Sequence, residues 1–135
     1  MPLSSFVRVR TQFEGLHHWP DAPVPENYLR SPHRHLFVVE SDIEVFHDDR
    51  EIEINAATRW LDTVIPSLAA PQSATPQPAA DTGPLILGSQ SCEQLATRIT
   101  QAILERYGRH RSLRCTVLED GILGAGVSWR PEPAQ

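Results

Sequence analysis

Two histidines, His33 and His35, are separated by one residue at the start of a segment that is typical of a β-strand. Side chains two positions apart on a strand point to the same face, so both imidazoles can converge on one point. Neutral imidazole nitrogens bind zinc at about 2.0–2.1 Å. The pair therefore predicts a metal site; the alternative is a chance pair of surface histidines beside Pro32.

A third ligand is available from the histidines that follow the first predicted strand. His17 and His18 lie beyond residues 6–13, and either can complete the site if the two strands are neighbours. Three imidazoles with one open coordination position form the catalytic arrangement of zinc, whereas closed structural sites usually use thiolates. The two cysteines, Cys92 and Cys115, lack the Cys-x-x-Cys spacing and are expected to be reduced thiols. The sequence predicts an open site.

The elements that position these histidines are strands joined by a proline-rich loop. Residues 6–13 partly alternate apolar with polar side chains, which is typical of a strand with one solvated face. Residues 17–32 contain four prolines, which oppose both helix and central strand. A long strand follows over residues 35–46, and Asp48-Asp49 predicts a turn into another strand at 51–54. We expect these two strands to form an antiparallel hairpin.

Two helices are predicted from apolar residues at three- and four-residue spacing. The first follows Asn55, a suitable N-cap, and Pro66 is expected to end its regular part. The second begins near Ser91, with Gln94 completing a capping box, and ends at Gly108. Both helices present one apolar stripe, so we expect them to cover a sheet.

Two further segments complete a single domain over residues 1–135. Residues 69–84 contain almost no large apolar side chain that could offset the entropy of ordering, which predicts a flexible surface linker. Residues 113–117 and 125–129 alternate around a glycine-rich connection, which predicts a closing hairpin. The expected order is strand, hairpin, helix, linker, helix, hairpin.

Composition narrows the classes of function. The formal charge of −5 argues against a basic nucleic-acid-binding surface, so no nucleic-acid partner is expected. All twelve basic side chains are arginines, which excludes a lysine Schiff base. No apolar run of about eighteen residues is long enough to span a membrane, and the N-terminus lacks the layout of a signal peptide. We expect a cytoplasmic protein with no membrane partner.

Four motifs, in the same order, resemble those of the 6-pyruvoyl- and 6-carboxytetrahydropterin synthases. Residues 13–20, FEGLHHWP, resemble Phe-x-Ala-Ala-His-x-Leu-Pro and place the ligand at His17 rather than His18. His33-Arg34-His35 resembles His-Gly-His. Residues 91–96 are similar to Thr-x-Glu-x-Leu-Ala, and residues 117–120 with 125–127 are similar to Val-x-Glu-Thr followed by an aliphatic strand. The motifs span nearly the whole chain.

The resemblance implies a tunnelling fold (T-fold): a four-stranded antiparallel sheet with two helices on one face, in subunits that join as homo-oligomers, usually hexamers. It implies Zn²⁺ at His17, His33 and His35 and a ligand similar to 7,8-dihydroneopterin triphosphate. Glu119 matches the glutamate that anchors the pterin ring, since a carboxylate accepts two parallel hydrogen bonds. The alternative is that Glu119 is an ordinary acidic residue on the surface. Glu93 is a second candidate, although the helix dipole favours an acid there anyway.

The chain departs from these enzymes at the proton-transfer residues. The cysteine that precedes their His-Gly-His pair by four residues is Leu29 here, and no Asp-His pair follows the first helix. Three other side chains could replace them. Cys92 lies at the start of a helix, where the helix dipole favours a thiolate. The alternative is that Cys92 is only a small buried side chain. His18 and Glu26 share the loop of Leu29. Arg34 is expected to point away from the metal.

Three hypotheses follow. The first is a zinc-dependent pterin enzyme with substituted proton-transfer residues. The second is a zinc- and pterin-binding protein without turnover. The third is zinc-assisted hydrolysis with Glu26 as the base.

Overall fold

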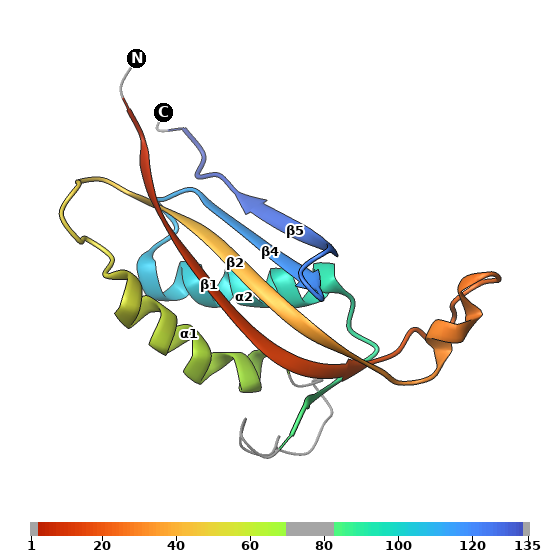
Figure 1. The fold of residues 1–135 in the computed structure, drawn as a ribbon. Coiled ribbons are helices and arrows are strands. Elements are labelled where there is room, and N and C mark those ends of the chain that lie inside the picture. Colours follow the sequence, from red (N-terminus) through yellow and green to blue (C-terminus); the bar gives the residue numbers. More distant parts are fainter. Residues whose placement is uncertain (1–2, 70–82, 134–135) are drawn as a thin grey trace.

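The computed structural model describes residues 3–69 and 83–133 (Figure 1). Its strands are β1 (Ser5–His17), β2 (His33–Val45), β3 (Leu85–Gly88), β4 (Leu113–Glu119) and β5 (Leu123–Trp129). Its helices are α1 (Ile54–Ala69), α2 (Cys92–Tyr107) and the short 3-10 helix η1 (Glu26–Arg30). The strands form one sheet in the order β3-β1-β2-β4-β5, in which β3 is parallel to β1 and the other neighbours are antiparallel. The α+β class with two helices is confirmed.

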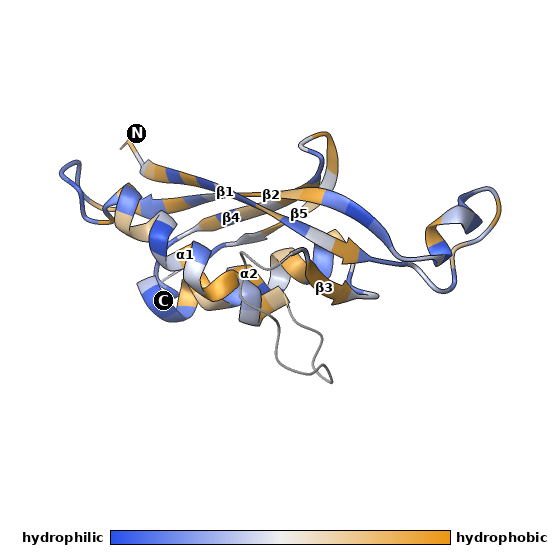
Figure 2. Cartoon of the chain, turned by 60° about the horizontal axis from the view of Figure 1, so that its bottom comes forward, coloured by the Kyte–Doolittle hydropathy of each residue, from blue (hydrophilic) through white to orange (hydrophobic). Residues whose placement is uncertain are grey.

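Both helices pack against the same face of the sheet, and the other face is open (Figure 2). Along β2 the odd-numbered residues from Phe37 to Val45 are buried, while most even-numbered side chains are partly exposed. The inward side chains pack on the apolar stripes of the helices. The largest fully buried ones include Phe37, Ile43, Leu61, Leu95 and Ile103. In β1 the even-numbered side chains from Phe6 to Glu14 are exposed, so the predicted solvated face of the first strand is confirmed.

The predicted sheet of four antiparallel strands is wrong in detail, because a fifth strand, β3, makes the sheet mixed. Leu85 and Leu87 are buried and Ile86 between them is exposed, as expected of a strand with one inward face. Four residues are too few to reveal that period in a sequence. β3 pairs with the end of β1, where Gly88 is the partner of His17 and accepts a 3.0 Å hydrogen bond from the His18 amide.

The predicted hairpin into a strand at 51–54 is also wrong. β2 pairs with β1 and β4, and α1 begins at Ile54. The two acids of this segment bind nearby amides instead: Glu51 accepts a 2.7 Å hydrogen bond from the Phe46 amide, and it also forms an ion pair with Arg111 at 2.9 Å. Glu53 accepts the amides of Asn55 and Ala56 at 2.6 and 3.1 Å, so Glu53 rather than Asn55 caps α1. Local hydrogen bonds of this kind compete with strand pairing.

Helix α1 continues beyond Pro66 to Ala69, which corrects the expected end. Proline removes one helical hydrogen bond, but Ile65 and Ala69 on either side of it are buried in the core and hold the last turn in place. Ala69, the first residue of the linker predicted at 69–84, therefore belongs to α1, and residues 70–82 of that linker lie outside the described part of the chain.

Helix α2 and the closing hairpin follow the sequence closely. Ser91 Oγ accepts the Gln94 amide at 3.2 Å and Gln94 Oε1 accepts the Ser91 amide at 2.9 Å, which is the predicted capping box. The C-cap is Gly108, at a φ of 106°. β4 and β5 pair as predicted, although β5 already begins at Leu123. Within the described residues, no helix has the length and apolarity needed to cross a membrane.

Candidate metal centre

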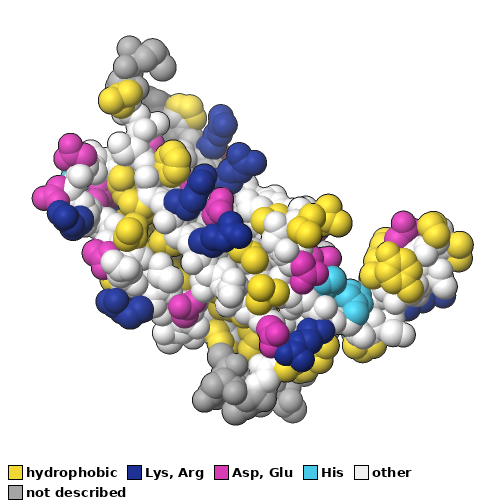
Figure 3. Space-filling model, viewed as in Figure 1, with side chains coloured by type: hydrophobic (Ala, Val, Ile, Leu, Met, Phe, Trp, Pro, Cys, Tyr) yellow, Lys and Arg dark blue, Asp and Glu magenta, His cyan; other side chains and the backbone are white. Residues whose placement is uncertain are grey.

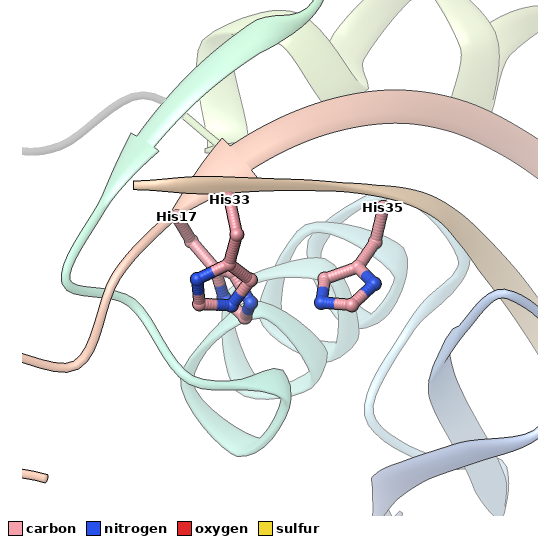
Figure 4. Close-up of side chains that lie close together, drawn as sticks. All are labelled: His17, His33 and His35. Atoms are coloured by element: carbon pink, nitrogen blue, oxygen red, sulfur yellow. The ribbon is translucent and has the colours of Figure 1, made fainter. Parts of the chain in front are cut away.

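The three predicted ligands lie at the ends of two neighbouring strands. His17 is the last residue of β1 and His33 the first of β2, and the two are direct partners in the antiparallel pairing. His35 stands two residues further along β2 and points to the same face. The three imidazoles gather below the end of the strands, over α2 (Figure 4). The register of one strand pair thus assembles the whole group.

The imidazoles are close enough to share one ion. One ligand atom from each histidine lies within 4.8 Å of the other two. The ring centroids are 4.6 Å apart for His17 and His33, 5.0 Å for His33 and His35, and 5.4 Å for His17 and His35. Ligands of a tetrahedral zinc ion are separated by about 3.3 Å, as its bond lengths require. Small side-chain rotations would close the difference.

Each imidazole is oriented through its Nδ1 atom by an acceptor outside the cluster. The pairs are His17 with the Gln90 carbonyl at 3.2 Å, His33 with the Ser31 carbonyl at 2.9 Å, and His35 with Asp120 Oδ2 at 2.8 Å. An Nδ1 that donates to a carbonyl or carboxylate leaves Nε2 as the free lone pair, which is the usual arrangement around a metal-bound histidine. In this tautomer all three imidazoles have Nε2 available for a metal ion.

Two of these Nε2 atoms lack a hydrogen-bond partner. His17 Nε2 and His35 Nε2 are buried and unsatisfied. Burial is also the main reason why the pKa of His17 is lowered from its ordinary value, which favours the neutral imidazole that metals bind. Buried polar atoms normally have partners. The donor set therefore fits a metal ion.

Glu119, the predicted ring anchor, is the last residue of β4 and lies against the cluster. Its Oε1 is 3.3 Å from His17 Nε2 and its Oε2 is 3.5 Å from His35 Nε2. The Cys92 thiol donates to Oε1 over 3.9 Å. The carboxylate thus directly faces the Nε2 atoms of two of the three histidines.

A pocket of about 570 Å³ opens beside the cluster. It is lined by His17, His18, Trp19, Leu29, His33, Ser89, Gln90, Ser91, Cys92, Glu93, Gln94, Glu119, Leu123 and Gly124. This volume is in the range of small-molecule sites. Histidine and acidic side chains reach the surface where the loop 18–32 leaves the sheet (Figure 3). The structure thus brings Glu93, Glu119, Cys92 and His18 to one pocket.

Two candidates for proton transfer lose support. Glu26 is exposed at the start of η1 and does not line the pocket. Cys92 is buried, and desolvation together with the carboxylates of Glu119 and Glu93 raises the pKa of its thiol to about 12. The thiolate expected from the helix dipole is therefore disfavoured, and the alternative of a small buried side chain agrees with the structure.

Sequence reasoning missed the residues that orient the ligands. Asp120 accepts from His35 and, through Oδ1, from the Leu36 amide at 3.0 Å. The side-chain Nε2 of Gln90 donates to the Leu87 and Ala69 carbonyls at 2.9 and 2.6 Å, which fixes the loop whose Gln90 carbonyl accepts from His17. The only feature of the sequence that pointed to Asp120 was its position next to Glu119 in a turn. No feature of the sequence pointed to Gln90.

Arg34 forms an ion pair with Glu14 on the face opposite the histidines, as expected.

No known protein family matches the chain, and no curated protein matches it.

Proposed function

We propose that this chain is a divergent relative of the 6-pyruvoyl- and 6-carboxytetrahydropterin synthases that binds zinc and, beside it, a dihydropterin-like small molecule. The observation that carries the proposal is the cluster of His17, His33 and His35, in which every Nδ1 is held by an outside acceptor. Surface histidines that lie together by chance have no need of three such partners. The same arrangement recurs around metal-bound histidines.

Zinc is the ion that the donor set favours. Three neutral imidazoles in a compact group suit zinc better than magnesium or calcium, which prefer oxygen ligands. Zinc bound there would supply a Lewis acid that polarises an oxygen of the ligand's side chain. The protein's own contribution is to hold the three rings and to exclude bulk water from His17, which is buried.

A pterin-like ligand fits the chemistry of the pocket. Glu119 at its wall offers two carboxylate oxygens, which can accept from a ring N–H and an adjacent amino group. Trp19 lines the same pocket and is half exposed, so its ring is available to stack on a planar heterocycle. A single carboxylate and an aromatic surface are sufficient to orient such a ligand.

The T-fold and the homo-oligomer are part of the same proposal. They are supported by the antiparallel order β1-β2-β4-β5 with both helices on one face. β5 is an edge strand, and edge strands tend to pair with another chain. The expected assembly is a hexamer of about six times 15.1 kDa, which light scattering on the purified protein tests. A monomer at all concentrations would contradict the proposed hexamer but not the proposed metal site.

Binding without turnover is the function that the geometry supports best. Leu29 lines the pocket and cannot transfer a proton, and the Cys92 thiol stays protonated at neutral pH. A lyase acting on the dihydropterin is the second candidate, because the imidazole of His18 lines the pocket and histidine is the side chain that most often acts as a general base in enzymes. Hydrolysis with Glu26 as the base has no geometric support.

The experiment is a titration of the zinc-loaded protein with 7,8-dihydroneopterin triphosphate, followed by pterin fluorescence, with chromatography of the products. Saturable binding that is lost without zinc supports the proposal, and the presence of product decides between binder and lyase. A matched titration with a purine nucleoside triphosphate controls for binding through the phosphates alone. Equal binding with and without zinc would contradict the proposal.

A further inference from the structure

The carboxylate of Glu119 stands where a metal ligand would stand. Its two oxygens are 3.3 Å from His17 Nε2 and 3.5 Å from His35 Nε2. Neither contact is a hydrogen bond, because both nitrogens remain without a hydrogen-bond partner. Two nitrogens with free lone pairs thus lie within 3.5 Å of a carboxylate, an arrangement that a shared cation would satisfy.

The separations match those within a zinc coordination sphere. For ligand bonds of about 2.0–2.2 Å at tetrahedral angles, neighbouring ligand atoms are about 3.3–3.5 Å apart. The Glu119 oxygens already have this spacing to two of the three histidines. Carboxylate oxygen is an ordinary zinc ligand beside imidazole nitrogen. No other acidic side chain in the described part of the chain forms an ion pair with His17.

The backbone holds Glu119 in this position. It ends β4, where it pairs with Phe37 of β2 and Leu123 of β5. The next residue, Asp120, is clamped to the start of β2, since its amide donates to the Leu36 carbonyl at 2.7 Å and its side chain accepts from His35. Two consecutive acids thus meet the two nitrogens of the His35 ring: Asp120 at Nδ1 and Glu119 at Nε2.

We propose that Glu119 is the fourth ligand of the metal when the pocket holds no small molecule. This assignment rests on the proposed three-histidine metal site. The site is then closed by its own chain, and a ligand of the pocket must displace the carboxylate to reach the metal. The displaced carboxylate lies at the pocket wall, where it becomes available to the incoming heterocycle. Metal affinity and small-molecule binding are therefore coupled through Glu119.

The test uses cobalt(II) in place of zinc, because its visible absorption reports the ligands. Four-coordinate cobalt with protein ligands only should give intense visible bands that do not change between pH 6 and 9. The E119Q variant should bind cobalt at least about 10-fold more weakly in competition with a chelator, a loss of the size seen when supporting groups are removed. Its spectrum should become pH-dependent, because a metal-bound water now titrates near neutral pH.

The matched control is E105Q, which removes the same charge from an exposed position of α2 outside the pocket and should leave affinity and spectrum unchanged. Several outcomes would overturn the assignment: equal affinity of E119Q and wild type, a pH-dependent wild-type spectrum, or the strong near-ultraviolet band of a thiolate ligand, which would indicate Cys92. The wild-type pH series needs no variant and so remains decisive if E119Q folds poorly. Failure of the wild type to bind cobalt or zinc would overturn the metal site itself.

Discussion

Asp120 Oδ2 lies 2.8 Å from His35 Nδ1, and Oδ1 of the same carboxylate accepts the Leu36 amide at 3.0 Å. One side chain at the end of β4 thereby fixes both the ring and the backbone at the start of β2. The hydrogen bond from His35 is also the main reason why the pKa of Asp120 is lowered. A carboxylate that orients a histidine in this way raises its basicity toward a metal.

We therefore expect Asp120→Ala to weaken zinc affinity by about 10–100-fold, as other carboxylates that support metal-bound histidines do. Competition with a fluorescent chelator measures the affinity, and Asp120→Asn, which keeps an acceptor oxygen, should lose less. Asp48→Ala, an exposed acid in the loop after β2, is the control. An affinity for Asp120→Ala equal to that of the control would show that Asp120 does not support the site.

The Cys92 thiol should be unreactive in the folded, metal-free protein. With its pKa raised to about 12, only about one thiol in ten thousand is ionised at pH 8. Cys115 is buried as well, and burial raises its pKa. Alkylation by iodoacetamide at pH 8 should be on the order of 1,000-fold slower than in the urea-unfolded chain. A folded-state rate within tenfold of the unfolded rate would restore Cys92 as a candidate nucleophile.

The strands and helices that the sequence predicted are those with a long apolar period. β1, β2 and α2 each run for 13 or 16 residues, so the alternation or the helical stripe is repeated several times. β3 has four residues and no such repeat. The segment 51–54 alternates like a strand, but the amides of Phe46 and Asn55 take up its carboxylates. The alternation in the sequence does not reveal the hydrogen-bond partners of these two acids.

The sequence predicted the three histidines and the pocket residue Glu119, but not the groups that orient the rings. The pair His33 and His35 was predictable because side chains two positions apart on a strand point to the same face. The acceptors that orient the rings come from distant segments: Gln90 is 73 residues from His17, and Asp120 is 85 residues from His35. The pKa of Cys92 likewise depends on burial and on Glu119. Such contacts exist only once the sheet order is known.

The cap of α1 should make stability depend on pH. The amides of Asn55 and Ala56 lower the pKa of Glu53 below its ordinary value of 4.5, the Asn55 amide contributing most. The stabilisation is therefore complete above pH 4.5 and is lost as the pH falls through the lower folded-state value. Urea unfolding should show Glu53→Gln less stable than wild type at pH 7, with the difference shrinking toward pH 3. Glu26→Gln, an exposed acid in η1, is the control; a pH-independent difference for Glu53→Gln would contradict the capping role.

Gly124 should tolerate no side chain in the β4–β5 hairpin. A Cβ there would lie 1.9 Å from the Val117 carbonyl oxygen, which is backbone and cannot turn away. Gly124→Ala should therefore cost about 1–3 kcal/mol of unfolding free energy, as overpacking does. At Gly126 the closest atom, the Cys115 carbonyl oxygen, is 3.0 Å away, so Gly126→Ala should cost less. Thermal unfolding of both variants measures the order, and the reverse order would mean that the hairpin pairs differently.

The most direct test of the account is the zinc content of the purified protein and of two double variants, determined by elemental analysis. The wild type should contain about one zinc per chain. His33→Ala/His35→Ala should contain none while remaining folded by circular dichroism. His47→Ala/His110→Ala removes two histidines remote from the cluster and should retain the full content. Unchanged zinc in the His33→Ala/His35→Ala variant would contradict the three-histidine metal centre, and with it the function proposed for this chain.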